Sequence, residues 1–592
     1  MGKTCKRARL PVGPGCCSMS FDYSQLPREY PRRFLSPEVD FDDWSQVERI
    51  FAEFEKRSIH SVEDLESWLE HESEFYSAFY EVYALRYARM TCQTDDPERE
   101  KAYLHFVEEI EPKAKPLIFN LDKKFLEIPA REQLPDHYFV LNRRLQNNVA
   151  LFRPENVELE KEEAKLSQKF EKIAAARTVF YDGQERTLQQ MAQYLEDVNR
   201  DTRKETWSLA ENRRIKDRET LDRLYSELVG LRHKIAKNTG FDNYMEYAFR
   251  RRERFDYTPQ DCIRFHDAVE QHVVPLMRSL DQARGKSLQV EQLRPWDLDV
   301  DPTGKPPLKP FNGAVELMQK CGRIYDELDS DFAANFRRMV DLALIDPESR
   351  RGKAPGGYCL ELPELRLPFI FLNLVGRDND VRTILHESGH AFHNFATRNL
   401  APHFQYRGEN APTEFAEVAS MSMELLGGEH IEGTFYDHND AARSKREHLE
   451  SIVRILPWIA TIDAFQHWVY TNPDHTARER EEFWLGLRAR FGGAESWEGY
   501  EEIQRSYWQR QGHLFTSPFY YIEYGIAQLG ALGIWVQYRK DPKAGVTSYK
   551  RALALGGSKT LPELFGAAGL PFDFGPQIVQ SYVRELSAEL RS

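Results

Sequence analysis

The segment HESGH at residues 386–390 holds the side chains with the clearest potential for chemistry, arranged as H-E-x-x-H. On a helix, His386 and His390 lie four residues apart on one face, about 5–6 Å from each other, so both imidazoles can bind one metal ion. Zinc is the expected ion because it binds neutral imidazole nitrogens, and a catalytic zinc site combines three protein ligands with a water. Glu387 follows the first histidine directly and can reach that water as a general base.

The surrounding sequence predicts the helix that positions this motif. Just upstream, the turn residues Gly356-Gly357 and the segments 358–360 and 369–372 predict two short strands. Asp378 and Asp380 can cap the N-terminus of the helix. An exposed helix that carries these side chains by chance is the alternative, and the context disfavours it. Apolar residues recur at helical spacing through the segment, at Val381, Ile384, Leu385, Phe392 and Phe395.

A third metal ligand is required, and the helix-like segment at residues 412–426 can supply it. It offers Glu414, Glu417 and Glu424, of which the last two are seven residues apart and share one helix face. The metzincin continuation H-x-x-G-x-x-H, which supplies a third histidine, is absent. A solvated helix face is the alternative for each glutamate and the favoured interpretation for Glu414.

Several segments follow one another in the order found in one known family. In chain order they are LRHKIAKNTGFDNYMEY (231–247), the W-D pair near Trp296, HESGHAFH (386–393) and FAEVAS (415–420). With them, the sequence resembles the M3 family of zinc oligopeptidases, the group of thimet oligopeptidase and oligoendopeptidase F. The AEVAS segment and the upstream PFIFLN are closer to the oligoendopeptidase F branch. The resemblance covers roughly residue 178 to the end of the chain.

The resemblance implies roles for residues beyond the motif. It makes Glu417 the third zinc ligand and Glu424 the hydrogen-bonding partner of a zinc-binding histidine, as ligating imidazoles generally require. The family often carries histidine at the position of His393. Two roles are equally open for this residue, one beside the metal site and one as a packed side chain.

The tyrosine-rich segment GHLFTSPFYYIEYG at residues 512–525 resembles the part of the family that stabilises the oxyanion of peptide hydrolysis. His513 and Tyr524 are the best-matched imidazole and phenol. Tyr520 and Tyr521 are also candidates, and the sequence does not rank them. Packing of a core helix is the alternative for each of these side chains.

The implied fold is mainly α, a closed bowl with a small β-sheet next to the H-E-x-x-H helix and a deep central channel. The implied activity is zinc-dependent hydrolysis of internal peptide bonds in short oligopeptides, with one Zn²⁺ per chain. A carboxypeptidase or dipeptidyl carboxypeptidase on the same fold remains an alternative, as does a non-catalytic peptide-binding relative. The segment PFIFLN (368–373) could be an edge strand that pairs with an extended peptide, or part of an ordinary turn region.

Three regions are expected along the chain. Residues 1–20 are basic and rich in Pro and Gly without the apolar stretch of a secretory signal, and predict a disordered tail. Residues 21–205 form a helical region with a short hairpin near 178–187, where Asp182-Gly183 marks the turn. Residues 206–592 form the catalytic region.

Composition narrows the function classes and the location. The chain has 592 residues, with 80 Lys and Arg against 94 Asp and Glu, a formal charge of −14 that disfavours a nucleic-acid binder. The run Arg250-Arg251-Arg252 is therefore expected on a solvated face. Apolar runs are too short to span a membrane. Seven cysteines without a C-x-x-C pair favour a reducing compartment, and the cytoplasm is the expected location. The oligomeric state is left open.

Overall fold

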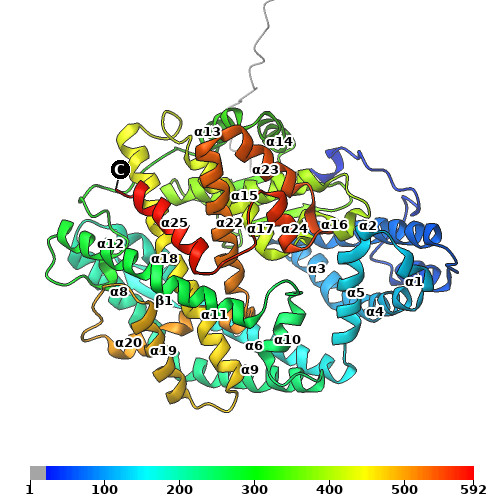
Figure 1. Ribbon diagram of the computed structural model, residues 1–592, viewed down its shortest axis with the longest axis horizontal. Helices are drawn as coiled ribbons and strands as arrows, with labels where there is room; N and C mark the ends of the chain where they lie inside the picture. The colour runs from blue at the N-terminus through cyan, green and yellow to red at the C-terminus, as the bar shows by residue number, and fades with distance from the viewer. Residues whose placement is uncertain (1–21, 592) are drawn as a thin grey trace, which may run out of the picture.

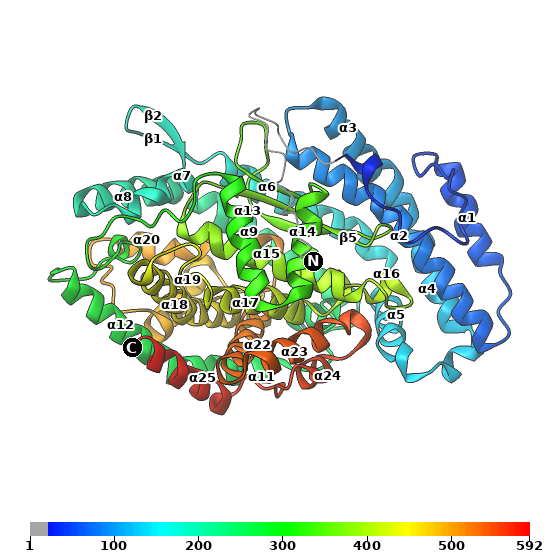
Figure 2. The same ribbon diagram turned by 90° about the horizontal axis from the view of Figure 1, so that it is seen from above.

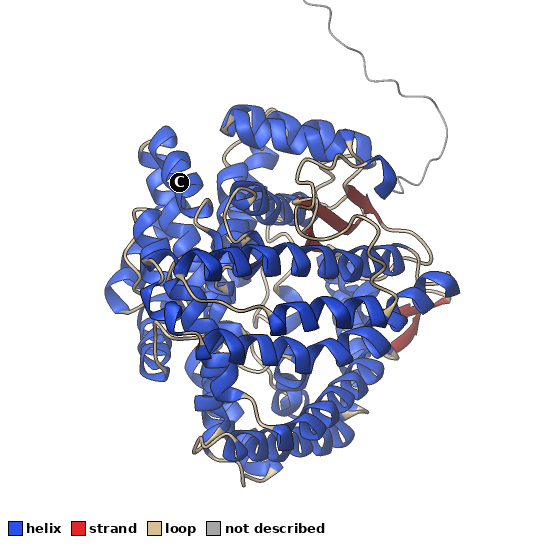
Figure 3. Ribbon diagram, turned by 90° about the vertical axis from the view of Figure 1, so that its right-hand side faces the viewer, coloured by secondary structure: helices blue, strands red, loops and turns tan. Residues whose placement is uncertain are grey.

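The computed structural model describes residues 22–591, so the tail predicted at residues 1–20 lies outside the described residues. Helices make up most of the described chain, and the strands form one two-stranded and one three-stranded sheet (Figure 3). The expectation of a mainly α fold with a small sheet is confirmed. No helix in residues 22–591 combines the length and the apolar character needed to cross a membrane.

The N-terminal helices α1 to α5 gather on one side of the molecule (Figure 1). The side chain of Asp43 caps α1, and Ser61 and Asp64 form a reciprocal capping box at the start of α2. The apolar faces of these helices pack into a hydrophobic cluster of their own, which includes Phe51 and Trp68. The helices of this part and the one that follows are α1 (Trp44–Lys56), α2 (Val62–Cys92), α3 (Pro97–His105), α4 (Glu111–Glu127), α5 (Phe139–Leu151) and α6 (Val157–Ala175).

The predicted hairpin forms and projects from the body of the protein (Figure 2). Strands β1 (Thr178–Tyr181) and β2 (Gln184–Thr187) pair antiparallel. Asp182 and Gly183 connect them with φ angles of 51° and 70°. Two consecutive residues with φ > 0 are typical of the type I′ turn, which explains the Asp-Gly pair.

A second group of helices leads from the hairpin to the larger sheet. Thr187 caps the short helix α7 through a capping box with Gln190. Most of these helices contribute apolar side chains to the large hydrophobic core of the protein. They are α7 (Leu188–Met191), α8 (Arg200–Ile215), α9 (Arg218–Asn238), α10 (Tyr244–Arg251), α11 (Pro259–Ala268), α12 (Val274–Ser287), α13 (Ala314–Leu328) and α14 (Ser330–Asp341).

The larger sheet consists of β3 (Ile345–Glu348), β4 (Tyr358–Leu362) and β5 (Leu367–Leu374), in the order β3-β5-β4. The segment PFIFLN lies on β5, which pairs in parallel with β3 and antiparallel with β4. The interpretation of PFIFLN as an edge strand was therefore wrong, because the unexpected strand β3 covers its other side. Within this sheet, β4 is an outer strand.

The remaining helices follow the sheet and complete the large core. Asp380 accepts hydrogen bonds from three backbone N–H groups, of residues 375, 376 and 377, and so fixes the start of α15. The helices are α15 (Asp378–Thr397), α16 (His403–Tyr406), α17 (Thr413–Gly428), α18 (His438–Thr471), α19 (Ala477–Phe491), α20 (Glu501–Ser506), α21 (His513–Thr516), α22 (Tyr521–Lys540), α23 (Pro542–Leu553), α24 (Leu561–Ala567) and α25 (Pro576–Glu589).

Candidate metal centre and active site

The site is built where α15 and α17 cross at very short distance. A Cβ atom added to Gly389 would lie 2.5 Å from the carbonyl oxygen of Ala419, and one added to Gly427 would lie 2.7 Å from a methyl of Leu385. At Gly389 the added atom would meet the backbone of α17, so only glycine fits there without a shift of the helices, whereas at Gly427 the side chain of Leu385 would have to move. The glycine inside the H-E-x-x-H motif thus lets the second helix approach the histidines.

This crossing brings His386, His390 and Glu417 together. Their ligand atoms all lie within 4.8 Å of one another. Oε2 of Glu417 is 3.5 Å from Nε2 of His386 and 3.8 Å from Nε2 of His390. The two imidazole side chains remain 24% and 22% exposed, so solvent reaches the group. Two imidazoles and one carboxylate fit a catalytic zinc site, which keeps its fourth position for water.

Glu424, two turns along α17, holds the first histidine from behind. Its Oε1 lies 2.7 Å from Nδ1 of His386, and its Oε2 lies 3.2 Å from Nε2 of His448 on α18. Burial would raise the pKa of Glu424, but the two histidines outweigh it and lower that pKa to about 2. His448 could not be identified from the sequence, because it stands alone on a different helix and no motif marks it.

Glu387 is next to His386 in sequence and lies beside the donor group, the three residues His386, His390 and Glu417. It is buried, with 7% of its surface exposed. Burial, together with the negative charges of Glu417 and Glu424, raises the pKa of Glu387 to about 7 against the opposing effect of His386. The backbone N–H of Cys359 on β4 hydrogen-bonds to its carboxylate. The outer strand of the sheet therefore runs directly past the predicted general base.

Tyr520 and Tyr524, at the start of α22, face Glu417 of the donor group. The hydroxyl of Tyr520 donates to Oε1 of Glu417 over 3.4 Å. Tyr524 hydrogen-bonds with Tyr520, and their ring centres lie 5.1 Å apart. Tyr521 differs, since its hydroxyl pairs with the side chains of Trp458 and Gln511. The structure thus brings Tyr520 and Tyr524 toward Glu417 and turns Tyr521 into the wall.

His513 stands next to all three tyrosine rings, at centroid distances of 5.6, 5.1 and 6.1 Å from Tyr520, Tyr521 and Tyr524. The indole N–H of Trp458 can only donate, and it donates to Oε1 of Gln511 over 3.0 Å. The amide nitrogen of Gln511 must then donate to Nδ1 of His513, 2.7 Å away.

This hydrogen-bond chain fixes the tautomer of His513. With Nδ1 as the acceptor, the ring proton resides on Nε2. Burial and the nearby Arg252 lower the pKa of His513, which keeps the ring neutral. His513 can therefore act as a neutral N–H donor.

The structure also defines the surroundings of two other predicted residues: those of His393 match its packing alternative, and those of Glu414 differ from the expectation. His393 is 1% exposed, its Nε2 has no hydrogen-bond partner among the described residues, and burial lowers its pKa to about 3. Its surroundings are those of a packed side chain. Glu414 was expected on a solvated face, and this was wrong, because it is 4% exposed and accepts a hydrogen bond of 2.6 Å from Tyr257. Burial comes first among the causes that raise the pKa of Glu414 to about 7.

The arginine run at residues 250–252 is solvated only in part. Arg250 and Arg251 are exposed. Arg252 is half-buried instead, and its Nε donates to the carbonyl oxygen of Pro518 over 2.8 Å. Its guanidinium lies 5.1 Å from the ring centre of Tyr520. Arg252 therefore braces the tyrosine segment, which the sequence analysis did not anticipate.

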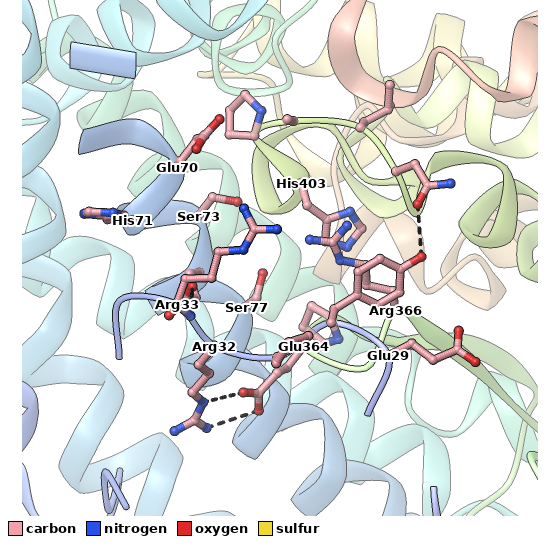
Figure 4. A pocket seen from close by; sticks show the side chains of 18 residues that line it. Glu29, Arg32, Arg33, Glu70, His71, Ser73, Ser77, Glu364, Arg366 and His403 are labelled. Carbon is pink, nitrogen blue, oxygen red and sulfur yellow. Dashed lines mark hydrogen bonds and ion pairs between the residues drawn. The ribbon is translucent and has the colours of Figure 1, made fainter. Parts of the chain in front are cut away.

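A separate pocket of about 380 Å³ lies between the segment 29–33, α2 and residues 399–403 (Figure 4). Arg32 donates to Glu364 in its wall, and His403 also lines the pocket. Among the described residues that line this pocket, none belongs to the donor group of His386, His390 and Glu417. The pocket is thus distinct from the candidate metal centre.

Comparison with known protein families identifies the family of this chain. Residues 193–582 match peptidase family M3, and residues 37–152 match the N-terminal domain of M3 peptidases. The chain belongs to peptidase family M3.

Solved structures and a curated relative agree with this assignment. PZ peptidase A, solved with an inhibitor, is 29% identical with a TM-score of 0.85, covering 96% of this chain and 99% of that one. A structure provisionally called oligoendopeptidase F is 30% identical with a TM-score of 0.85, covering 97% and 99%. An oligoendopeptidase F homologue of Borreliella burgdorferi is 23% identical over 296 residues, 48% of each protein. The matches span less than half of the length of the curated relatives.

Proposed function

We propose that this protein is a zinc-dependent endopeptidase that hydrolyses internal bonds of short peptides. The observation that carries the proposal is the convergence of His386, His390 and Glu417 within 4.8 Å, with Glu387 buried beside them. Membership of family M3 and the names of its oligoendopeptidase relatives support it. Short peptides are the proposed substrates, reached through the central channel that the family resemblance implies.

The three donor residues would hold the zinc ion, with Glu424 orienting His386. When bound, zinc supplies Lewis acidity at this point, which lowers the pKa of a water and polarises the scissile carbonyl. Glu387 takes the proton of the attacking water. It then passes this proton to the leaving amine, because a positioned carboxyl group can act first as general base and then as general acid.

Tyr520, Tyr524 and His513 form the oxyanion-stabilising side of the site. Their phenol and Nε2–H groups can donate to the oxygen that becomes negative when the carbonyl is attacked. Tyr521 is assigned to the wall, because its hydroxyl already pairs with Trp458 and Gln511. The outer strand β4 passes Glu387, so an extended peptide in the site would lie beside this strand.

The main rival is a carboxypeptidase or dipeptidyl carboxypeptidase on the same fold. Mass spectrometry of the products from a randomised peptide library separates the two. Internal cuts at many positions support the endopeptidase, and ladders that start at the C-terminus overturn it. A chain that contains zinc yet cleaves no peptide would favour a non-catalytic peptide-binding protein.

We also propose the cytoplasm as the location. Cys92, Cys262, Cys321 and Cys359 are free thiols in the described part of the chain. Unpaired thiols agree with a reducing compartment.

A further inference from the structure

A second cluster of metal-binding side chains lies between α11 and α18, away from the H-E-x-x-H helix. It consists of Cys262 on α11 and of Asp463 and His467 on α18. Their ligand atoms all lie within 4.8 Å of one another, the same criterion that the first group meets. His266, one turn along α11 from Cys262, joins the cluster through Asp463.

The cluster is buried and Asp463 is its centre. Cys262 and Asp463 are fully buried, and His467 retains 11% of its side-chain surface. Oδ2 of Asp463 lies 2.8 Å from Nε2 of His266 and 3.2 Å from Nε2 of His467. Two imidazoles from different helices thus converge on one carboxylate next to a thiol.

Polar atoms in the cluster lack hydrogen bonds. Oδ1 of Asp463 has no hydrogen-bond partner among the described residues, and Nε2 of His467 has only its 3.2 Å contact with Oδ2 of Asp463. A buried polar atom without a partner is destabilising, and more so when its group is charged. These are also the atoms that a metal ion would use.

The nearby positive charge of Arg254 does not neutralise the cluster, so a cation can. Arg254, a nearby positive charge, is committed to Glu523 through an ion pair of 2.8 Å. Cys262 would give up its proton to bind a metal ion as a thiolate. Thiolate and carboxylate together would then neutralise a divalent ion.

From this geometry we infer that Cys262, Asp463 and His467 form a second metal site, suited to zinc. Sulfur, imidazole and carboxylate ligands are all common in zinc sites. His266 holds the carboxylate of Asp463, as outer partners of metal ligands generally do. Three protein ligands leave a fourth position open, and the bound ion would tie α11 to α18.

The bound ion would also steady the tyrosine segment. The ring of His467 lies 5.8 Å from that of Phe519, and the backbone N–H of Phe519 donates to Gln466 over 2.6 Å. Phe519 directly precedes Tyr520 and has a φ of 62°. An ion that fixes His467 therefore restrains the backbone that presents Tyr520 to Glu417.

Cobalt substitution distinguishes the two sites, because the first group has no sulfur ligand. We expect Co²⁺ exchanged into the full chain to give a near-ultraviolet thiolate-to-cobalt charge-transfer band. Cys262→Ser should abolish this band and lower the metal content from about two ions per chain to about one. Cys321→Ser is the matched control, since Cys321 is also fully buried but is not part of either metal-binding group. It should retain the band and both ions.

A chain without the first site gives an independent test. In the double variant His386→Ala, Glu417→Ala, we expect the band and one ion to remain. A wild-type chain that takes up only one cobalt ion and shows no thiolate band would overturn the inference. The negative charge of Asp463 would then be balanced by a protonated His266 or His467. Should Cys262→Ser fail to fold, the wild-type spectrum and the double variant decide. Loss of the first site lowers the metal content by one ion but leaves the thiolate band unchanged, so the band is independent of the proposed peptidase activity.

Discussion

Nδ1 of His386 lies 2.7 Å from Oε1 of Glu424, a contact that leaves Nε2 of the same ring facing Glu417. A carboxylate on one nitrogen fixes the tautomer and makes the other nitrogen a better metal ligand. Because Glu424 and Glu417 share a face of α17, one helix supplies both a predicted ligand and the residue that orients another.

We expect Glu424→Gln to weaken zinc binding by about 10–100-fold, the usual effect of removing such a partner. The amide retains the size of the side chain but loses the charge that pairs with His386 and His448. Titration with a chelator of known affinity measures the change. Glu429→Gln, which removes a carboxylate paired with Lys445 near the end of α17, is the control and should bind zinc normally. Equal affinities in the two variants would contradict the assignment.

Glu387→Gln should retain zinc but lose nearly all turnover. The amide cannot accept the proton of the attacking water, while the metal ligands are untouched. Elemental analysis and an assay with an internally quenched peptide test the two halves of this prediction. Near-normal activity in the variant would remove Glu387 as the general base.

Glu417→Ala should lose its zinc, whereas Glu414→Ala should retain it and be less stable. Glu414 is buried against Tyr257 and next to Arg254, so its removal leaves polar groups unsatisfied at a cost of about 1–3 kcal/mol. Metal analysis and thermal unfolding of both variants provide the comparison. Equal zinc retention in the two proteins would refute Glu417 as a ligand.

Tyr520→Phe and Tyr524→Phe should each lower kcat far more than they raise KM. Loss of one oxyanion donor typically costs about 10²–10³ in rate, and an interaction made only in the transition state affects kcat and kcat/KM alike. Tyr521→Phe is the control, because its hydroxyl is engaged by Trp458 and Gln511. If only Tyr521→Phe loses activity, the orientation of this segment in the catalytic state differs from the one described.

Gly389→Ala should destabilise the protein and impair zinc binding together. The new methyl group would press on the Ala419 carbonyl, and such overpacking costs about 1–3 kcal/mol. Gly428→Ala, at the end of α17 where a Cβ meets nothing within 4 Å, should be neutral or slightly stabilising. Thermal unfolding with and without zinc measures both. A Gly389→Ala protein as stable as Gly428→Ala would show that the helices can move apart.

Local patterns predicted the helices, the hairpin and the position of His386 and His390 on one helix face. A helix repeats every few residues and a motif carries its own spacing, so both are visible in one stretch of sequence. The prediction that α15 and α17 converge rested on the family resemblance. The structure gives the physical cause, because Gly389 lets the two helices approach closely.

Features that depend on distant partners could not be predicted. His448 lies behind Glu424 only because α18 packs there. The burial of Glu414 depends on Tyr257, far away in sequence, and helical spacing alone cannot tell a solvated carboxylate from a buried one. Strand β3 contains a Pro and two acidic residues, Ile345–Glu348, a composition that propensity disfavours and that pairing with β5 overrides.

Helix α18 spans 34 residues, or about 51 Å at 1.5 Å per residue. Along it lie His448 behind the first site, Trp458 in the chain to His513, and His467 in the second cluster. One residue inserted between His448 and His467 would rotate everything beyond it by about 100° and separate these contacts. Length changes in this lineage should therefore accumulate in surface loops such as the one joining β1 to β2, while the interval from 448 to 467 keeps a constant length.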